Sequence, residues 1–137
     1  MQNGIVAQKL QALDHTLVEL RSLGHVSVKQ LNANWQTQRA VERSLQVLVE
    51  VVIDVCQRLL AVSGQSPATT SADAIHRCIE MGVLTQDENY TRMLQLRNFL
   101  VHRYERSDPE ALVNMVNRHL GDFEKFRDEI LAYVQEH

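Results

Sequence analysis

Apolar residues recur every three or four positions along most of this chain, which is the spacing of amphipathic helices. The pattern predicts one helix over residues 5–22, which Gly24 ends, and a long helix from about 35 to 62. The long segment is so rich in valine and leucine that we expect it at the centre of the fold. Its apolar residues include Val47, Leu48, Val51, Val52, Val55 and Leu59.

Capping and breaking residues divide the chain further. Ser27 and Gln30 fit a capping box, in which each side chain bonds the backbone N–H of the other residue. The Ser-Gly-Gln-Ser-Pro run at 63–67 predicts a break, and a short helix over about 71–81 then stops at Gly82.

Two more start signals lie in the second half of the chain. Thr85 and Glu88 fit a capping box that begins a helix running to about 104. Asp108 and Pro109 begin a last helix that runs to about 135. We therefore predict an all-α antiparallel bundle of four main helices with one or two short ones, as a single domain over residues 1–137.

Composition narrows the class of protein. The chain has 137 residues, of which only 5 are glycine and 2 proline, and this scarcity of turn formers favours helices over a β-sandwich. The formal net charge of −3 excludes a broad basic coat for nucleic acids but leaves room for a local basic site. Apolar runs are too short for a membrane span, and no signal peptide begins the sequence, so we expect a cytoplasmic protein. Cys56 and Cys78 fit reduced thiols there, with one disulfide left open and no zinc motif.

The end of the 85–104 segment departs from simple amphipathic patterning. Its sequence is Arg97-Asn98-Phe99-Leu100-Val101-His102-Arg103-Tyr104. At about 100° per residue, the polar side chains of Arg97, Asn98, His102 and Tyr104 share roughly one half of the helix. Val101 lies among them, which suggests that a second copy of the chain covers this face as a homodimer.

Arginine and histidine together suit RNA cleavage without a metal or other cofactor. A neutral imidazole such as His102 can take a proton from a 2′-hydroxyl, and a guanidinium such as Arg97 can stabilise charge on the phosphate. One histidine per chain leaves either the base or the acid role vacant, and a dimer supplies both. Asn98 would hold the imidazole or a phosphate oxygen.

The Arg-Asn-x3-His-x-Tyr constellation resembles the motif of the HEPN superfamily, and most closely that of the HepT toxins of bacterial toxin–antitoxin pairs. The resemblance implies a homodimeric, metal-independent ribonuclease toxin with Arg97 and His102 as its catalytic pair. It also implies a partner, an MntA-type minimal nucleotidyltransferase that attaches AMP to Tyr104. Because the chain is acidic overall, affinity for RNA, whether transfer or messenger RNA, would then come from Arg92, Arg97, Arg103 and Arg106.

Other functions remain open from the sequence alone. The same cleft could hold a nucleotide or RNA without cutting it, or the chain could be the antitoxin of a toxic nucleotidyltransferase. A third alternative is a helical dimer in which the motif only makes interface hydrogen bonds.

Two further features have alternative interpretations. Asp54, and less favourably Glu50, could orient Arg97 or His102, but a solvated stripe with an Asp54–Arg58 pair is favoured. Trp35 could stack on a base, but a single tryptophan at a helix start is more often part of the core.

Overall fold

The computed structural model describes residues 4–102 and 108–137, and the regular structure in these ranges is helical. The helices are α1 (Gly4–Arg21), α2 (Val28–Ala33), α3 (Trp35–Val62), α4 (Ser71–Glu80), α5 (Glu88–Val101), α6 (Pro109–Arg118) and α7 (Gly121–Glu136). The prediction of an all-α fold is confirmed. The division differs, because these ranges hold seven helices instead of four main and one or two short ones.

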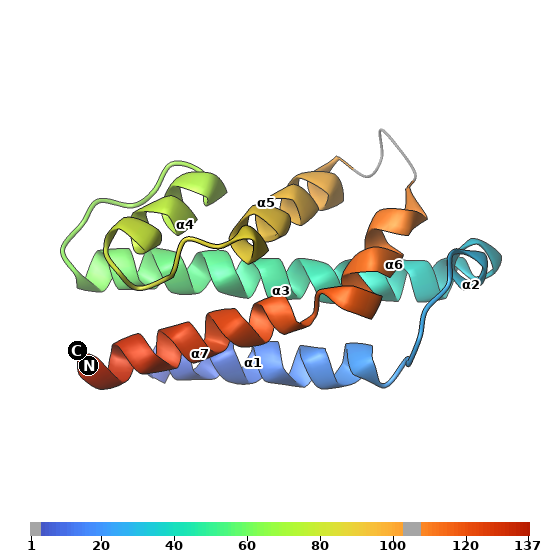
Figure 1. Cartoon of the computed structure of the whole chain (residues 1–137), viewed down its shortest axis with the longest axis horizontal. Coiled ribbons are helices and arrows are strands. Elements are labelled where there is room, and N and C mark those ends of the chain that lie inside the picture. The colour runs from blue at the N-terminus through green and yellow to red at the C-terminus, as the bar shows by residue number, and fades with distance from the viewer. Residues whose placement is uncertain (1–3, 103–107) are drawn as a thin grey trace.

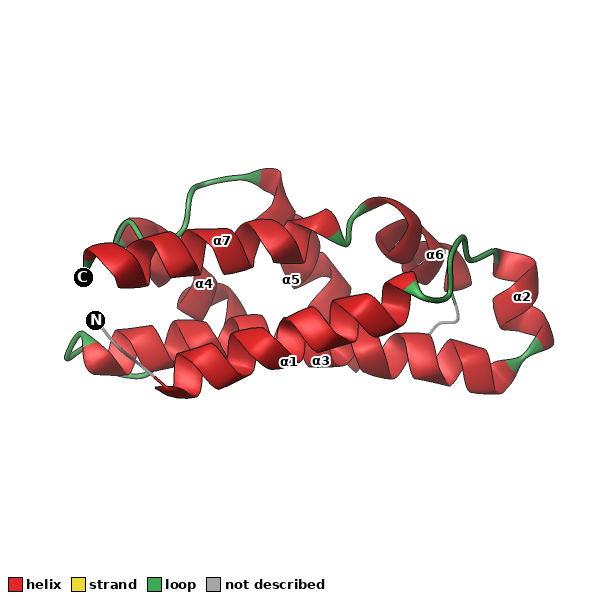
Figure 2. Cartoon of the chain, turned by 90° about the horizontal axis from the view of Figure 1, so that it is seen from below, coloured by secondary structure: helices red, strands yellow, loops and turns green. Residues whose placement is uncertain are grey.

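The long helix α3 is the axis of the molecule. Its 28 residues span about 42 Å at 1.5 Å per residue, and its bounds are those that the sequence predicts. It contacts every other helix in the described ranges. Figure 1 shows α4 and α5 following each other along one side of α3, with α1 along the other. The view from below separates α7 from α1 (Figure 2).

Local signals explain several helix ends. The Ser27 hydroxyl accepts a hydrogen bond from the Gln30 N–H at 3.1 Å, and the Gln30 side chain accepts one from the Ser27 N–H at 2.9 Å, so the predicted capping box is confirmed. Asn34 then caps α3 through its side-chain oxygen. Gly82 follows α4 with a φ of 79°, a left-handed conformation that side chains disfavour, and it ends that helix as predicted.

The predicted capping box at Thr85 is wrong. The cap of α5 is Asp87, whose carboxylate accepts from the Glu88 N–H at 2.6 Å. Thr85 is bonded to α7 instead, because its N–H and hydroxyl both donate to Glu129, at 3.0 and 2.9 Å. The described end of α5 also comes earlier than the predicted residue 104, because Val101 is its last helical residue and His102 is its C-cap.

The prediction of one unbroken last helix over 109–135 is also wrong. The predicted start is correct, since Asp108 caps α6 and Pro109 is its first residue. The chain then breaks at His119 and Leu120, just before Gly121, a residue type with low helix propensity. The break allows α6 to pack on α2 while α7 packs on α1, α3 and α5.

One hydrophobic cluster joins the described helices. Among its most deeply buried members are Leu13, Leu31, Leu45, Leu59, Ile75, Phe123 and Phe126. Cys56 and Cys78 are both buried and free, so the disulfide that the sequence leaves open is not formed. Trp35 is 68% exposed, and the prediction that it belongs to the core is therefore wrong.

Candidate active site

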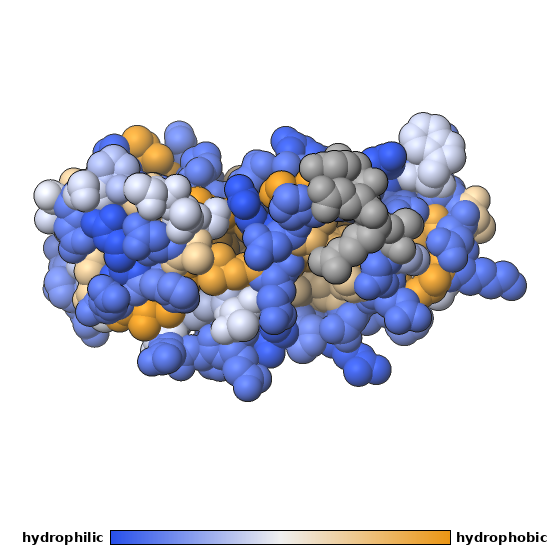
Figure 3. Space-filling model, turned by 90° about the horizontal axis from the view of Figure 1, so that it is seen from above, coloured by the Kyte–Doolittle hydropathy of each residue, from blue (hydrophilic) through white to orange (hydrophobic). Residues whose placement is uncertain are grey.

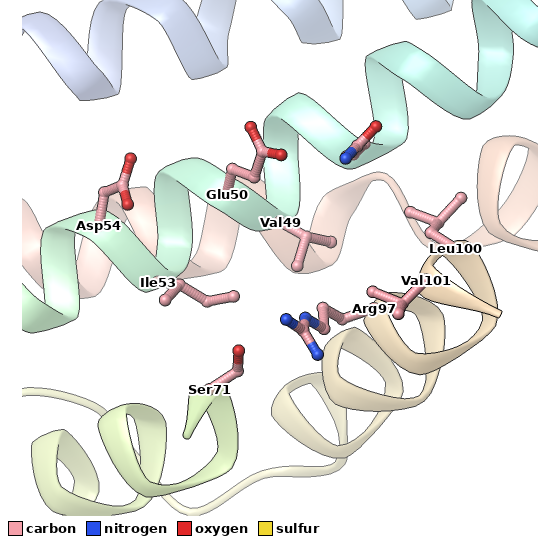
Figure 4. Close-up of a pocket in the computed structure, with 9 residues that line it drawn as sticks. Val49, Glu50, Ile53, Asp54, Ser71, Arg97, Leu100 and Val101 are labelled. Carbon is pink, nitrogen blue, oxygen red and sulfur yellow. The ribbon is translucent and has the colours of Figure 1, made fainter. Parts of the chain in front are cut away.

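A pocket of about 220 Å³ lies where α3, α4 and α5 meet. Val49 and Ile53 of α3 form one wall of the pocket. Ser71, the first residue of α4, lies at a second wall, and α5 contributes Arg97 and Val101. In Figure 4 the Arg97 side chain extends toward the space between Ile53 and Ser71. A permanently charged, fork-shaped donor thus reaches into a partly apolar recess, an arrangement that suits phosphate oxygens.

The loop between α3 and α4 is pinned so that α4 begins beside this pocket. The Gln57 amide donates to the Ala68 carbonyl at 3.0 Å and accepts from the Ala68 N–H at 2.9 Å. Two residues later Thr70 caps α4 by accepting from the Asp73 N–H at 3.0 Å. These bonds place Ser71, which sequence analysis did not single out, at the rim of the pocket. No local pattern in the sequence indicates that Ser71 would face the pocket.

Arg97 makes no ion pair or hydrogen bond with the residues that the structure describes. Its side chain is half-buried, and the neighbouring Val101 is 43% exposed on the same side of α5. The exposed valine beside this guanidinium fits the prediction that a second copy of the chain covers this face.

Asn98 and His102 are exposed at the C-terminal end of α5. The His102 N–H donates to the Asn98 carbonyl at 3.1 Å and closes the helix. His102 follows Arg97 by five residues, which is about 140° around a helix axis and about 7.5 Å along it. His102 is not among the residues that line the Arg97 pocket of the single chain.

The acidic residues near the pocket do not contact Arg97. Glu50 and Asp54 border the pocket, but Figure 4 shows their carboxylates directed away from the guanidinium. Asp54 instead accepts from Lys9 of α1 at 3.0 Å, with half of its side chain exposed. The favoured pairing with Arg58 is therefore replaced by an ion pair between helices α1 and α3.

Arg92 lies away from the Arg97 pocket. Its guanidinium makes two hydrogen bonds of 2.8 Å to the carboxylate of Asp122, which is buried at the start of α7. The Asp122 carboxylate raises the pKa of Arg92 above its ordinary value. Arg103, Tyr104 and Arg106, the other predicted RNA-binding and modification residues, lie outside the described residues.

The first half of α5 is tied to α7 by a second set of bonds. The buried Tyr90 hydroxyl donates to Glu129 at 2.8 Å, and its ring packs edge-on against Phe126. Burial, reinforced by the Glu129 carboxylate, raises the pKa of Tyr90 well above its usual range. These contacts fix α5 without using Arg97, Asn98 or His102.

Neither a metal centre nor a membrane segment emerges from residues 4–102 and 108–137. No group of three histidine, cysteine or acidic residues there could hold a metal ion. No helix in these ranges has the length and apolar character needed to cross a membrane.

Comparison with known proteins identifies the family of this fold. The family model described as Ribonuclease HepT-like matches residues 13–130, and the chain belongs to this family of helical ribonucleases. It is 26% identical to the mRNA nuclease HepT of Shewanella oneidensis, with 95% of this chain and 98% of that protein covered. It is 22% identical to the tRNA nuclease HepT of Aphanizomenon flos-aquae, over 95% of this chain and 90% of the relative.

A solved structure has the same fold. It is the tri-AMPylated HEPN toxin of Shewanella oneidensis in complex with an MNT antitoxin. The TM-score is 0.84 at 26% identity, with 96% of this chain and 99% of that chain covered.

Proposed function

We propose that this protein is the ribonuclease toxin of a toxin–antitoxin pair, and that it cleaves RNA without a metal ion. The observation that carries the proposal is the unpaired Arg97 guanidinium in a pocket of the motif helix, in a chain of the HepT-like family. The relatives are named as nucleases of messenger and of transfer RNA, so RNA of either kind is the substrate class.

Each motif residue has a chemical role in this proposal. The His102 imidazole takes the proton of the 2′-hydroxyl, whose oxygen attacks the adjacent phosphorus and expels the 5′-oxygen of the next nucleotide. The Arg97 guanidinium stabilises the additional negative charge on the phosphate. Asn98, exposed one turn before His102, orients the imidazole or a phosphate oxygen.

The active unit is a homodimer. His102 does not line the Arg97 pocket of its own chain, and a twofold axis beside α5 would bring Arg97 and His102 of two protomers together. The second protomer would also supply the acid that protonates the leaving oxygen. The exposed Val101 on this face fits burial against a second copy.

The antitoxin is a minimal nucleotidyltransferase, as in the complex of the Shewanella toxin. It silences the toxin by attaching AMP to Tyr104, within the motif. The added phosphate places negative charge and bulk near Arg97, which would compete with RNA for the guanidinium. We also propose that residues 1–137 act as a single domain, and that the pair works in the cytoplasm, where RNA is present.

The decisive experiment is RNA cleavage by protein made without its partner. Total RNA is incubated in EDTA with the wild type, with His102→Ala and with His76→Ala, a control that removes an exposed histidine of α4. Intact mass verifies beforehand that Tyr104 is unmodified. We expect the wild type and His76→Ala to cut and His102→Ala to lose at least about 100-fold in rate.

A second arm tests the modification. Incubation with the nucleotidyltransferase, ATP and magnesium should add AMP to the wild type but not to Tyr104→Phe, and should stop cleavage. If folded, unmodified protein leaves RNA intact in EDTA, the ribonuclease proposal is wrong. The chain would then be a binding module or the antitoxin, and growth inhibition by each gene expressed alone would identify the toxin.

A further inference from the structure

A second pocket, of about 250 Å³, lies on the other side of α5, between α5 and α6. Leu96, Phe99 and Met115 supply apolar surface to it, while Arg92, Gln95 and Asn114 supply polar groups. Seen from above, part of the apolar surface between these two helices is visible (Figure 3). The Arg97 pocket uses none of these residues.

The polar groups of this pocket differ in how firmly they are held. The guanidinium plane of Arg92 is fixed by its two 2.8 Å bonds to Asp122. Gln95 and Asn114 are exposed, and no hydrogen bond links their side-chain amides to the described part of the chain. Each amide thus keeps both a donor and an acceptor available for a ligand.

This combination fits a flat heteroaromatic ring. Apolar side chains and a fixed guanidinium plane suit the faces of a nucleobase, and amide side chains suit its hydrogen-bonding edge. A phosphate is a poorer fit, because Asp122 already neutralises the Arg92 charge. The pocket therefore favours the base of a nucleotide over its backbone.

The pocket is also close to the motif along the same helix. Gln95 precedes His102 by seven residues, which places both on nearly one stripe of the helix and about 10 Å apart along its axis. Stacked nucleotides rise by about 3.4 Å each, so this separation corresponds to about three nucleotides.

We propose that the pocket between α5 and α6 is a nucleobase subsite that selects which RNA sequence the toxin cuts, with Gln95 and Asn114 reading the base edge. This inference rests on the proposed ribonuclease function. It changes the role of Arg92 from a phosphate contact to a planar wall against which a base stacks.

Cleavage-site mapping tests the subsite. A pool of single-stranded RNA with random sequence is cut by the wild type, Gln95→Ala, Asn114→Ala and Gln36→Ala, a control that removes an exposed amide of α3. The wild type and Gln36→Ala should share one base preference within about three nucleotides of the cut. Each pocket variant should weaken that preference by about fivefold while still cutting, since an amide hydrogen bond contributes on the order of 1 kcal/mol.

A binding measurement separates the failure of this inference from the failure of the function. The affinities of oligo-A, oligo-C, oligo-G and oligo-U for His102→Ala are compared with those for His102→Ala combined with Gln95→Ala or Asn114→Ala. Base-dependent affinity that the added substitutions remove supports the subsite, even if the wild type never cuts RNA. The inference is overturned if neither the affinity nor the choice of cut site depends on the base, and if the substitutions change neither of them. Weaker binding of the nucleotidyltransferase alone would also overturn it and would assign the pocket to that protein.

Discussion

The two halves of α5 perform different tasks. In the first half, Tyr90 and Arg92 both bond to acidic residues of α7, and these bonds fix the helix in the bundle. In the second half, Arg97 has no partner in the described chain, and Asn98 and His102 are exposed. One short helix therefore combines an anchored end with an end whose polar groups face outward.

The contrast is sharpest between the two arginines. Arg92 and Arg97 are the same residue type, five positions apart on one helix. Arg92 faces Asp122, whereas Arg97 faces Val49 and Ile53 of α3, which offer no charge. What faces an arginine, more than its position on the helix, decides whether it stabilises the fold or stays available to a phosphate.

The largest effect should come from the free arginine. Arg97→Ala should lower the rate of RNA cleavage by at least about 100-fold, because the charge that develops on the phosphate loses its donor. The free energy of unfolding should change by less than about 0.5 kcal/mol, since no described bond is lost. Cleavage assays and urea denaturation of the same preparation measure both, with Arg118→Ala, an exposed arginine of α6, as the control. A destabilised Arg97→Ala would break the contrast.

Substitution of Arg92, the arginine bonded to Asp122, should instead lower the stability of the fold. Arg92→Ala leaves the buried Asp122 carboxylate without its two hydrogen bonds and should lower the free energy of unfolding by about 2 kcal/mol. Urea denaturation of Arg92→Ala, Asp122→Asn and the double variant forms a cycle that isolates the pair. Additive effects in this cycle would show that the two side chains do not support each other, and α5 would not be anchored there.

The periodicity of apolar residues was sufficient to predict the bounds of α3, the helix that packs against its neighbours along its whole length. The bounds of α3 follow directly from its apolar stripe and from the cap at Asn34. Periodicity did not predict the start of a helix where a residue distant in the sequence bonds to the expected cap. Glu129, more than 40 residues away, accepts from the N–H and hydroxyl of Thr85, and the cap of α5 is Asp87.

The candidate active site shows the same difference between local patterns and contacts from distant parts of the chain. The motif from Arg97 to His102 is contiguous, so the sequence alone could indicate its chemistry. The partners of Asp54 and Arg92 lie on other helices, and no local pattern indicates that Lys9 and Asp122 would meet them. The exposure of Trp35 is likewise a tertiary outcome, because packing around α3 leaves its first residue outside the core.

A smaller effect should follow from the tyrosine in the anchored half. Tyr90→Phe keeps the ring that packs on Phe126 but removes the hydroxyl that donates to Glu129 at 2.8 Å. The free energy of unfolding at pH 7 should fall by about 1 kcal/mol, because one hydrogen bond is lost while Glu129 still accepts from Thr85. Cleavage should remain at the wild-type rate, because Arg97 and His102 are untouched.

The same variant has a distinct pH dependence. Burial and the Glu129 carboxylate raise the pKa of Tyr90 above that of the unfolded chain, so the folded state favours the neutral phenol. The contribution of the hydroxyl is fully present below about pH 10 and is lost as the pH rises above it, where the unfolded chain ionises first. The stability difference between wild type and Tyr90→Phe should therefore shrink above pH 10 in urea titrations. A constant difference would show that Tyr90 is not held neutral by the fold.

The smallest effect should come from the exposed pair at the start of α5. Lys125 of α7 donates to the Asp87 carboxylate, and this bond holds the pKa of Asp87 below its ordinary value. Because the folded state favours the charged carboxylate, the stabilisation is present above the unfolded pKa of about 4 and is lost as the pH falls through the folded value. Lys125→Met should thus be slightly less stable than wild type at pH 7 and equal to it at pH 2. The difference at pH 7 should also diminish in high salt, which screens an exposed pair more than the part-buried bonds of Arg92. A loss as large as that of Arg92→Ala would mean that α5 is anchored mainly at its cap, and the role assigned to Asp122 would be wrong.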